Sequence, residues 1–181
     1  MAMVEHFREM ALNNAWSNRR LHGACAGLSE AAFAAGRVGF FPSLRATLNH
    51  ILIVDWYYIE ALEGGGRGYA IFDNEIPFPQ FADLAEAQQA SDLKLAQFCG
   101  RLSEGDLGRQ VLLDRAERGV KQETVASVLP HLFIHQIHHR GQAHAMLSGT
   151  TAKPPQLDEF FLFEDRAATL PELAAIGLER G

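Results

Sequence analysis

Cysteine is scarce in this chain, and its two thiols are far apart in the sequence. Cys25 and Cys99 form no Cys-x-x-Cys motif. Isolated cysteines of this kind are more often buried as small apolar side chains than joined in a bridge. We therefore expect two buried free thiols, and a reducing, cytoplasmic compartment is the interpretation that follows from them.

Positively charged residues are also few. The chain has 16 Lys and Arg against 22 Asp and Glu, which gives a formal net charge of −6 and a pI of about 5.7. A nucleic-acid partner would need a basic face, and the segment 101–121, "RLSEGDLGRQVLLDRAERGVK", mixes both signs. We therefore expect no nucleic-acid partner.

No apolar run is long enough to cross a bilayer. The longest, "ILIVDWYYIEAL" (51–62), is interrupted by Asp55 and Glu60 and falls short of the roughly 20 residues that a spanning helix needs. Charged and polar side chains at residues 5–9 interrupt any secretory signal. We expect no attachment to a membrane.

Helical periodicity dominates what is present. Long helices are predicted over residues 3–28, 43–63, 80–102 and 123–148, with Ser43 as the N-cap of the second. A connection rich in Gly and Pro follows the second helix, and residues 105–121 fit a short β-hairpin around "RAERG". A short helical segment is expected after "FFLF" (160–163). The pattern predicts one domain over residues 1–181, an all-α four-helix bundle.

Histidine is concentrated in the last long helix. Five of the eight histidines lie between residues 131 and 144. At about 100° per residue, one face of that helix is apolar and carries Val128, Leu129, Leu132, Ala143, Met146 and Leu147. His139 falls inside this stripe and His135 just off its edge, whereas His131 and His138 lie on the flank and His144 on the other side.

His135 and His139 are one helical turn apart, a spacing that lets two imidazoles reach one metal ion. The alternative is that each finds a hydrogen-bond partner and simply packs. Catalytic zinc generally has three protein ligands, and His50, in the middle of the second helix, is the best third candidate; His6 and His22 are weaker. The chain contains neither Glu-x-x-His nor His-Glu-x-x-His, which argues against a ferritin-like di-iron site and the commonest zinc-protease site.

These residues carry a resemblance to a known family. "HLFIHQIHHRGQAHAML" (131–147) resembles the C-terminal motif of the DinB/YfiT-like family, a His-x-x-x-His-Arg-Gly-Gln run on the last bundle helix. "NNAWSNRRL" (13–21), "LNHILIVDWYYIEAL" (48–62) and "KPPQLDEFFLF" (153–163) are similar to its other conserved segments, in the same order. Residues 64–121 match only loosely.

The resemblance implies an up-and-down bundle of four long helices, commonly a homodimer. It implies a divalent metal, often zinc or nickel, held by three histidines that carry over to His50, His135 and His139. It also implies a stress-associated role and, by analogy with characterised relatives, transfer or isomerisation of a small electrophile with the help of a low-molecular-weight thiol. A non-catalytic metal- or ligand-binding protein is the alternative, and a metal-free bundle is a weaker one.

Several neighbouring residues have two interpretations. Tyr58, His138 and Arg140 are candidates for the pocket, where Arg140 would bind a substrate carboxylate; Arg140 would otherwise pair with Glu164 of the C-terminal tail. His131 is interpreted in the same way as His138, as a partner of a ligand histidine or as part of the pocket mouth. Asp55 is expected to be buried and bonded to a neighbouring helix, through Asn14 or Trp16, or else to support a ligand histidine.

Overall fold

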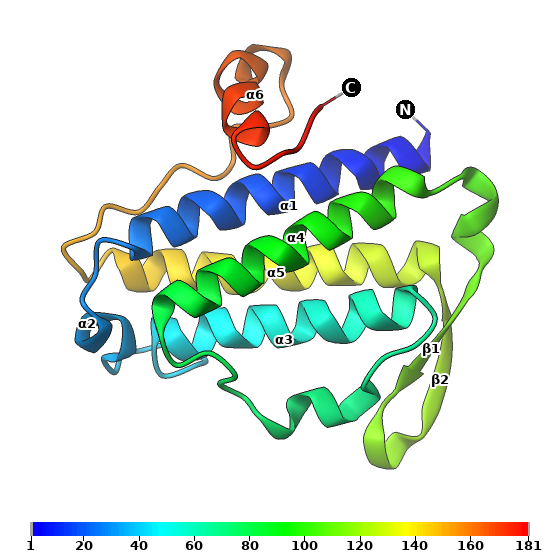
Figure 1. Ribbon diagram of the computed structural model, residues 1–181, viewed down its shortest axis with the longest axis horizontal. Helices are drawn as coiled ribbons and strands as arrows, with labels where there is room; N and C mark the ends of the chain where they lie inside the picture. Colours follow the sequence, from blue (N-terminus) through cyan, green and yellow to red (C-terminus); the bar gives the residue numbers. More distant parts are fainter. Residues whose placement is uncertain (1, 181) are drawn as a thin grey trace.

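Four long helices lie side by side in the computed structural model, which describes residues 2–180 (Figure 1). They are α1 (Met3–Cys25), α3 (Leu44–Leu62), α4 (Phe81–Arg101) and α5 (Val125–Leu147). The predicted all-α four-helix bundle is thus confirmed, and most of the predicted helix ends agree within two residues. The exception is α1, which ends at Cys25 rather than at residue 28.

Side-chain caps explain where two of these helices begin. The Ser43 hydroxyl accepts a hydrogen bond from the Ala46 N–H at 3.1 Å, and the Thr124 hydroxyl accepts one from Ser127 at 3.2 Å. Each satisfies a backbone donor that has no partner within its own helix. The short helix α2 (Glu30–Ala34) was not predicted, and it begins in the same way at Ser29.

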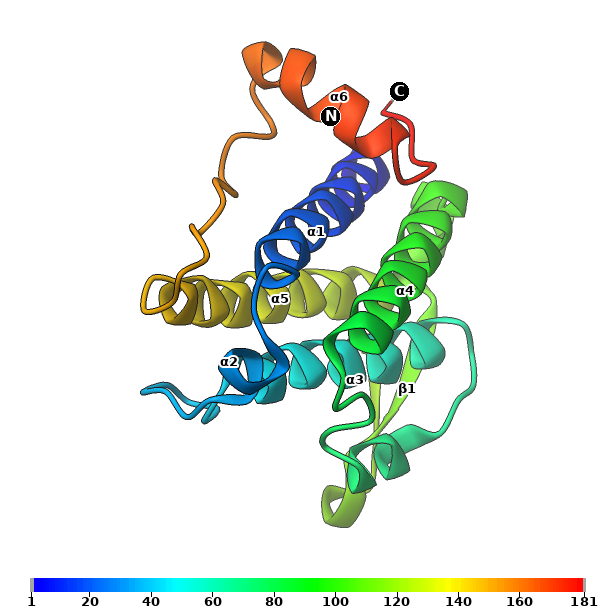
Figure 2. The ribbon, with the colours of Figure 1, turned by 60° about the vertical axis from the view of Figure 1, so that its left-hand side comes forward.

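The order of the helices around the bundle places α3 and α5 next to each other. α1 packs against α4 and α5, and α3 packs against the same two helices. α3 and α4 run in the same direction, because the connection 63–80, which contains the 3-10 helix η1 (Gly68–Asp73), returns along the bundle (Figures 1 and 2). The other consecutive long helices alternate in direction, so the bundle departs at α3 and α4 from the up-and-down order that the resemblance implied. α3 and α5 are therefore antiparallel neighbours.

The segment between α4 and α5 contains the predicted hairpin. After the 3-10 helix η2 (Glu104–Gly108), strand β1 (Gln110–Asp114) pairs antiparallel with β2 (Val120–Thr124), and η3 (Ala116–Arg118) lies at the turn. Val111 and Leu113 are buried, and the Tyr57 hydroxyl donates to the Asp114 carbonyl at 2.5 Å. These contacts fix the hairpin against the C-terminal half of α3.

The expected C-terminal helix is present as α6 (Arg166–Ala174), preceded by η4 (Phe163–Asp165). It packs on the outer face of α1 (Figure 2), where Trp16 and Phe160 are both buried with ring centroids 5.5 Å apart. Cys25 and Cys99 are buried and free, as predicted. Between residues 2 and 180, no helix has the length and apolar character needed to cross a membrane.

Candidate metal centre

Three histidines from two helices meet in one cluster. His50 lies on α3, and His135 and His139 lie one turn apart on α5. One ring nitrogen of each lies within 4.8 Å of the others, and the Nε2 atoms of His50 and His135 are 3.0 Å apart. The fold thus brings together the three histidines selected from the sequence.

The helical pattern explains why these rings point inward. His139 is buried and His135 is half-buried, whereas His131 and His138 on the same helix are exposed. Because α3 runs antiparallel beside α5, His50 reaches both, with ring centroids 5.0 Å from His135 and 4.6 Å from His139. The loop before α3 covers the cluster with Phe41, whose ring centroid is 4.3 Å from that of His50.

Burial keeps the three imidazoles uncharged. Burial, with a smaller contribution from neighbouring histidines, lowers the pKa of His50 to about 4 and that of His135 to about 3. The pKa of His139 is also lowered by burial, against the hydrogen bond that its ring donates to Gln142, which raises it. A neutral imidazole presents the lone pair that a metal ion needs, so the cluster is in its ligating form at neutral pH.

Gln142 determines which nitrogen of His139 is available. Its Oε1 lies 2.9 Å from His139 Nδ1, and its Nε2 lies 2.9 Å from His138 Nε2. An amide oxygen only accepts, so His139 Nδ1 carries the hydrogen and its Nε2 carries the lone pair. This is the usual arrangement behind a metal-ligating histidine. The donor set therefore fits a divalent metal ion.

The cluster opens onto a cavity of about 380 Å³. Its wall includes Tyr58 and His138, both selected from the sequence, and His131. Arg115, at the turn of the hairpin, also lines it and donates to the Tyr58 hydroxyl at 3.0 Å. Sequence reasoning missed Arg115, although it recognised "RAERG" as a turn, because only the docking of the hairpin on α3 brings this turn to the histidines.

Comparisons with known proteins support the family resemblance seen in the sequence. The sequence model of the DinB family matches residues 3–169. The chain belongs to the DinB family. It is 26% identical over 143 residues to Protein DinB of Bacillus subtilis (strain 168), and the aligned region covers 74% of this chain and 80% of that protein. Its fold is similar to the crystal structure of a DinB-like protein from Bacillus cereus ATCC 10987, with a TM-score of 0.60 and 14% identity over 78% of this chain and 90% of that one.

Arg140 of this DinB-family chain lies outside the histidine cavity. Its guanidinium is buried on the other side of α5 and donates to Asn14, to Asn18 at 3.1 Å and to Gln136 at 3.3 Å. It contacts neither the cavity nor Glu164, contrary to both interpretations from the sequence. The reason is geometric: the residue after His139 is turned about 100° from it around the helix.

Asp55 is buried as expected, but its partners differ from those predicted. It accepts hydrogen bonds from Gln136 and, at 2.8 Å, from Gln88, not from Asn14 or Trp16. Both partners belong to a buried polar network that joins all four long helices. Its members are Asn14, Asn18, Asp55, Gln88, Asp92, Gln136 and Arg140.

Proposed function

We propose that this protein binds one divalent metal ion, zinc or nickel, through His50, His135 and His139. We further propose that it is a metal-dependent enzyme that acts on a small electrophile with the help of a low-molecular-weight thiol. The observation that carries the proposal is the convergence of three neutral imidazoles, within 4.8 Å of one another, at the wall of a cavity of about 380 Å³.

Three neutral ligands would leave the full charge of the ion in place, and such an ion polarises a carbonyl and lowers the pKa of a bound water or thiol. Two residues of the wall suit substrate binding. The Tyr58 hydroxyl accepts from Arg115, so its own hydrogen is free to donate to a substrate oxygen. Arg115 is half-exposed at the cavity, where its guanidinium can hold an anionic group. Arg115 takes the role that the sequence assigned to Arg140.

Metal content tests the first half of the proposal. Purified protein should contain about one equivalent of metal, and EDTA should lower its melting temperature without abolishing cooperative unfolding, because the helical core does not depend on the ion. His139→Ala should lose the metal and become insensitive to EDTA. His144→Ala is the matched control on the same helix, since His144 binds the Pro155 carbonyl instead. Full occupancy in His139→Ala would contradict the assignment.

Thiol turnover tests the second half. Protein of known metal content is mixed with a panel of small thiols, glutathione among them, and an electrophile such as monochlorobimane. An enzyme should consume the thiol in a metal-dependent way, and His139→Ala should not. Metal binding without turnover of any thiol would favour the alternative function, a non-catalytic stress-associated protein that binds metal or a ligand.

A homodimer is part of the proposal, and an apolar groove between α1 and α5 supports it. Ile134 and Ile137 are 67% and 51% exposed there, beside Met3, Met10 and Phe133. Large exposed aliphatic side chains gathered in one groove are typical of an interface. Light scattering should give twice the 20.0 kDa of the chain, and Ile134→Glu should give the monomer. A wild-type monomer at micromolar concentration would contradict this part.

A further inference from the structure

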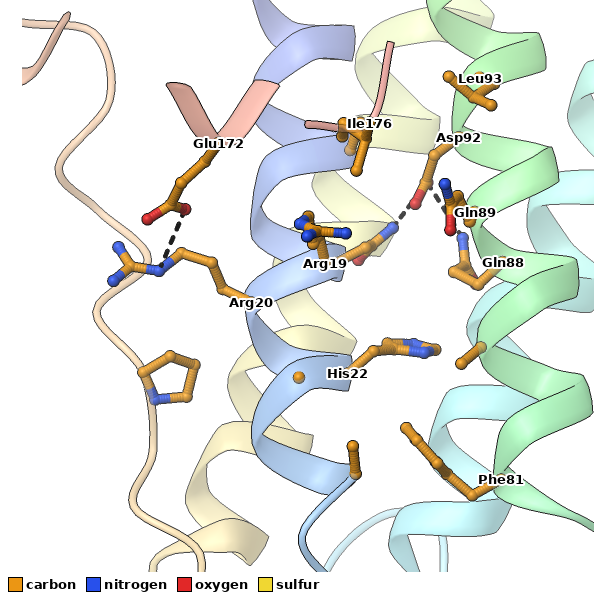
Figure 3. A pocket seen from close by; sticks show the side chains of 16 residues that line it. Arg19, Arg20, His22, Phe81, Gln88, Gln89, Asp92, Leu93, Glu172 and Ile176 are labelled. Atoms are coloured by element: carbon orange, nitrogen blue, oxygen red, sulfur yellow. Dashed lines mark hydrogen bonds and ion pairs between the residues drawn. The ribbon is translucent and has the colours of Figure 1, made fainter. Parts of the chain in front are cut away.

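A second cavity, of about 420 Å³, lies between α1 and α4 (Figure 3). It shares no lining residue with the cavity at the histidine cluster. His22 projects from α1 toward α4, where Gln88 and Asp92 face it across the space (Figure 3). The size is within the range of small-molecule sites, and nothing in the proposed metal chemistry uses these residues.

Two residues that line this cavity each have a buried polar atom with no hydrogen-bond partner among the described residues. The amide nitrogen of Gln88 donates to Asp55 and Asp92, which leaves its Oε1 buried and unpaired. His22 Nδ1 is also buried and unpaired, and burial lowers the pKa of this ring to about 4, so it is neutral. Unpaired buried polar atoms are rare and call for a partner.

Asp92 supplies a third acceptor. Its Oδ1 accepts from Asn14 at 3.1 Å, from Asn18 at 2.8 Å and from Gln88 at 3.1 Å. No described residue donates to its Oδ2, although the side chain is only 4% exposed. Gln88 Oε1 and Asp92 Oδ2 are acceptors, and His22 Nδ1 is an acceptor in the tautomer whose hydrogen is on Nε2. A ligand that satisfies these atoms must therefore donate hydrogen bonds.

The charge balance of the buried network favours a cation. Two carboxyl groups, those of Asp55 and Asp92, face a single guanidinium, that of Arg140. Burial, together with the charge of Asp55, raises the pKa of Asp92 well above its usual value. A buried carboxylate without a paired cation is costly, so a positive group placed beside Asp92 would gain both hydrogen bonds and charge.

We propose that the cavity between α1 and α4 is a second small-molecule site, which takes a protonated primary amine on an apolar body. The ammonium group lies among Asp92, Gln88 and His22. The apolar body packs on the side chains that line the rest of the cavity, which include Ala15, Phe81, Ala85, Leu93 and Ile176. Three donors on one small group match the three acceptors.

Arg19 distinguishes two kinds of ligand that carry such an amine, a simple amine and an amino acid. It is exposed at the cavity and makes no hydrogen bond or ion pair with the described residues, whereas Arg20 beside it pairs with Glu172 at 3.7 Å. A free amine leaves Arg19 without a partner. An amino acid adds a carboxylate that Arg19 can bind. Arg19→Gln should therefore weaken the binding of an amino acid and leave that of a simple amine unchanged or stronger.

Calorimetric titration with three matched probes tests the proposal: 2-phenylethylamine, phenylalanine and 3-phenylpropionate. At least one of the two amines should bind with a Kd of about 1 mM or lower, and the carboxylate alone should not bind. EDTA-treated protein and His139→Ala should bind the amine as the untreated protein does, which separates this site from the metal centre. Equal binding of 3-phenylpropionate, or no binding of either amine up to about 10 mM, would overturn the proposal.

Variants locate the binding. A Cβ at Gly23, which lines the cavity, or at Gly100, which does not, would meet nothing within 4 Å. Gly23→Leu fills the cavity and should weaken amine binding about tenfold or more, whereas Gly100→Leu on α4 should leave it unchanged. Asp92→Asn removes the charge with little change of shape and should also weaken binding about tenfold or more. Unchanged binding in folded Gly23→Leu or Asp92→Asn would contradict the assignment.

Discussion

α5 contributes to two polar clusters of opposite character. His135 and His139 belong to the histidine cluster beside the cavity, and the residues that directly follow them, Gln136 and Arg140, belong to the buried network. The histidine rings are neutral and border a cavity. Arg140 is charged, buried and surrounded by hydrogen-bond partners from other helices. Two adjacent positions on one helix thus meet different physical requirements.

The two clusters differ in how much stability the protein loses when one of their side chains is replaced. A neutral imidazole at the edge of a cavity can be replaced at small cost, because water reaches the atoms that it leaves. A charged side chain of the network cannot be replaced at small cost, because its removal leaves buried partners unpaired. We infer that the network fixes the packing of the four helices, and that the histidine cluster serves binding. The predictions below separate these roles, from the largest expected effect to the smallest.

Removal of the buried guanidinium should have the largest effect on stability. Arg140→Met leaves two carboxyl groups and three amide oxygens without their cation and donor, and should cost about 3–5 kcal/mol of unfolding free energy. Arg115→Met is the matched control, because it removes the same group from the half-exposed wall of the histidine cavity, and should cost about 1 kcal/mol or less. Urea unfolding measures both. Equal losses would contradict the distinction between the two clusters.

The two clusters also differ in how far the sequence predicted them. The spacing of His135 and His139, with an apolar stripe around them, indicated which rings face inward, because one helix determines that relation. The network depends on which helices are neighbours. Asp55 bonds to α4 and α5, and Arg140 to α1, because the connection 63–80 places α4 parallel to α3. No local pattern carries that information, so the sequence placed Arg140 at the histidine cavity instead of in the network.

Acid should destabilise the metal-free protein, and part of the effect belongs to His22. Its pKa is lowered to about 4 in the native state, while the unfolded chain binds a proton near pH 6.5. Stability from the neutral ring is therefore complete above pH 6.5 and falls as the pH drops toward 4. Asp55 and Asp92 act in the opposite direction, because burial raises the pKa of Asp55 to about 7 and that of Asp92 well above its usual value. Stability from their protonated forms therefore grows as the pH falls below their native pKa values.

A comparison of variants separates these contributions. His22→Phe keeps a ring beside Phe81 but cannot bind a proton. Between pH 7 and pH 4.5, its unfolding free energy should fall by about 2–3 kcal/mol less than that of the wild type, both measured in EDTA. Identical pH profiles would show that His22 is hydrated in the native protein. Such a result would also weaken the case for an unpaired ring in the second cavity.

Gln142 should affect metal binding and leave the fold almost unchanged. Its Oε1 holds the Nδ1–H of His139 at 2.9 Å and so orients the ring and its tautomer. Gln142→Ala should weaken metal affinity about 10- to 100-fold, as loss of such a partner generally does, or about 1.4–2.7 kcal/mol. Gln142→Glu keeps an acceptor at the same place and should preserve the affinity.

His138→Ala is the control on the other side of Gln142, because it removes the second partner of the amide and leaves the bond to His139 intact. Competition with a chelator measures all three variants. If Gln142→Ala bound metal as tightly as His138→Ala, the orientation of His139 would come from packing against Phe41, and the hydrogen bond would have no part in the site.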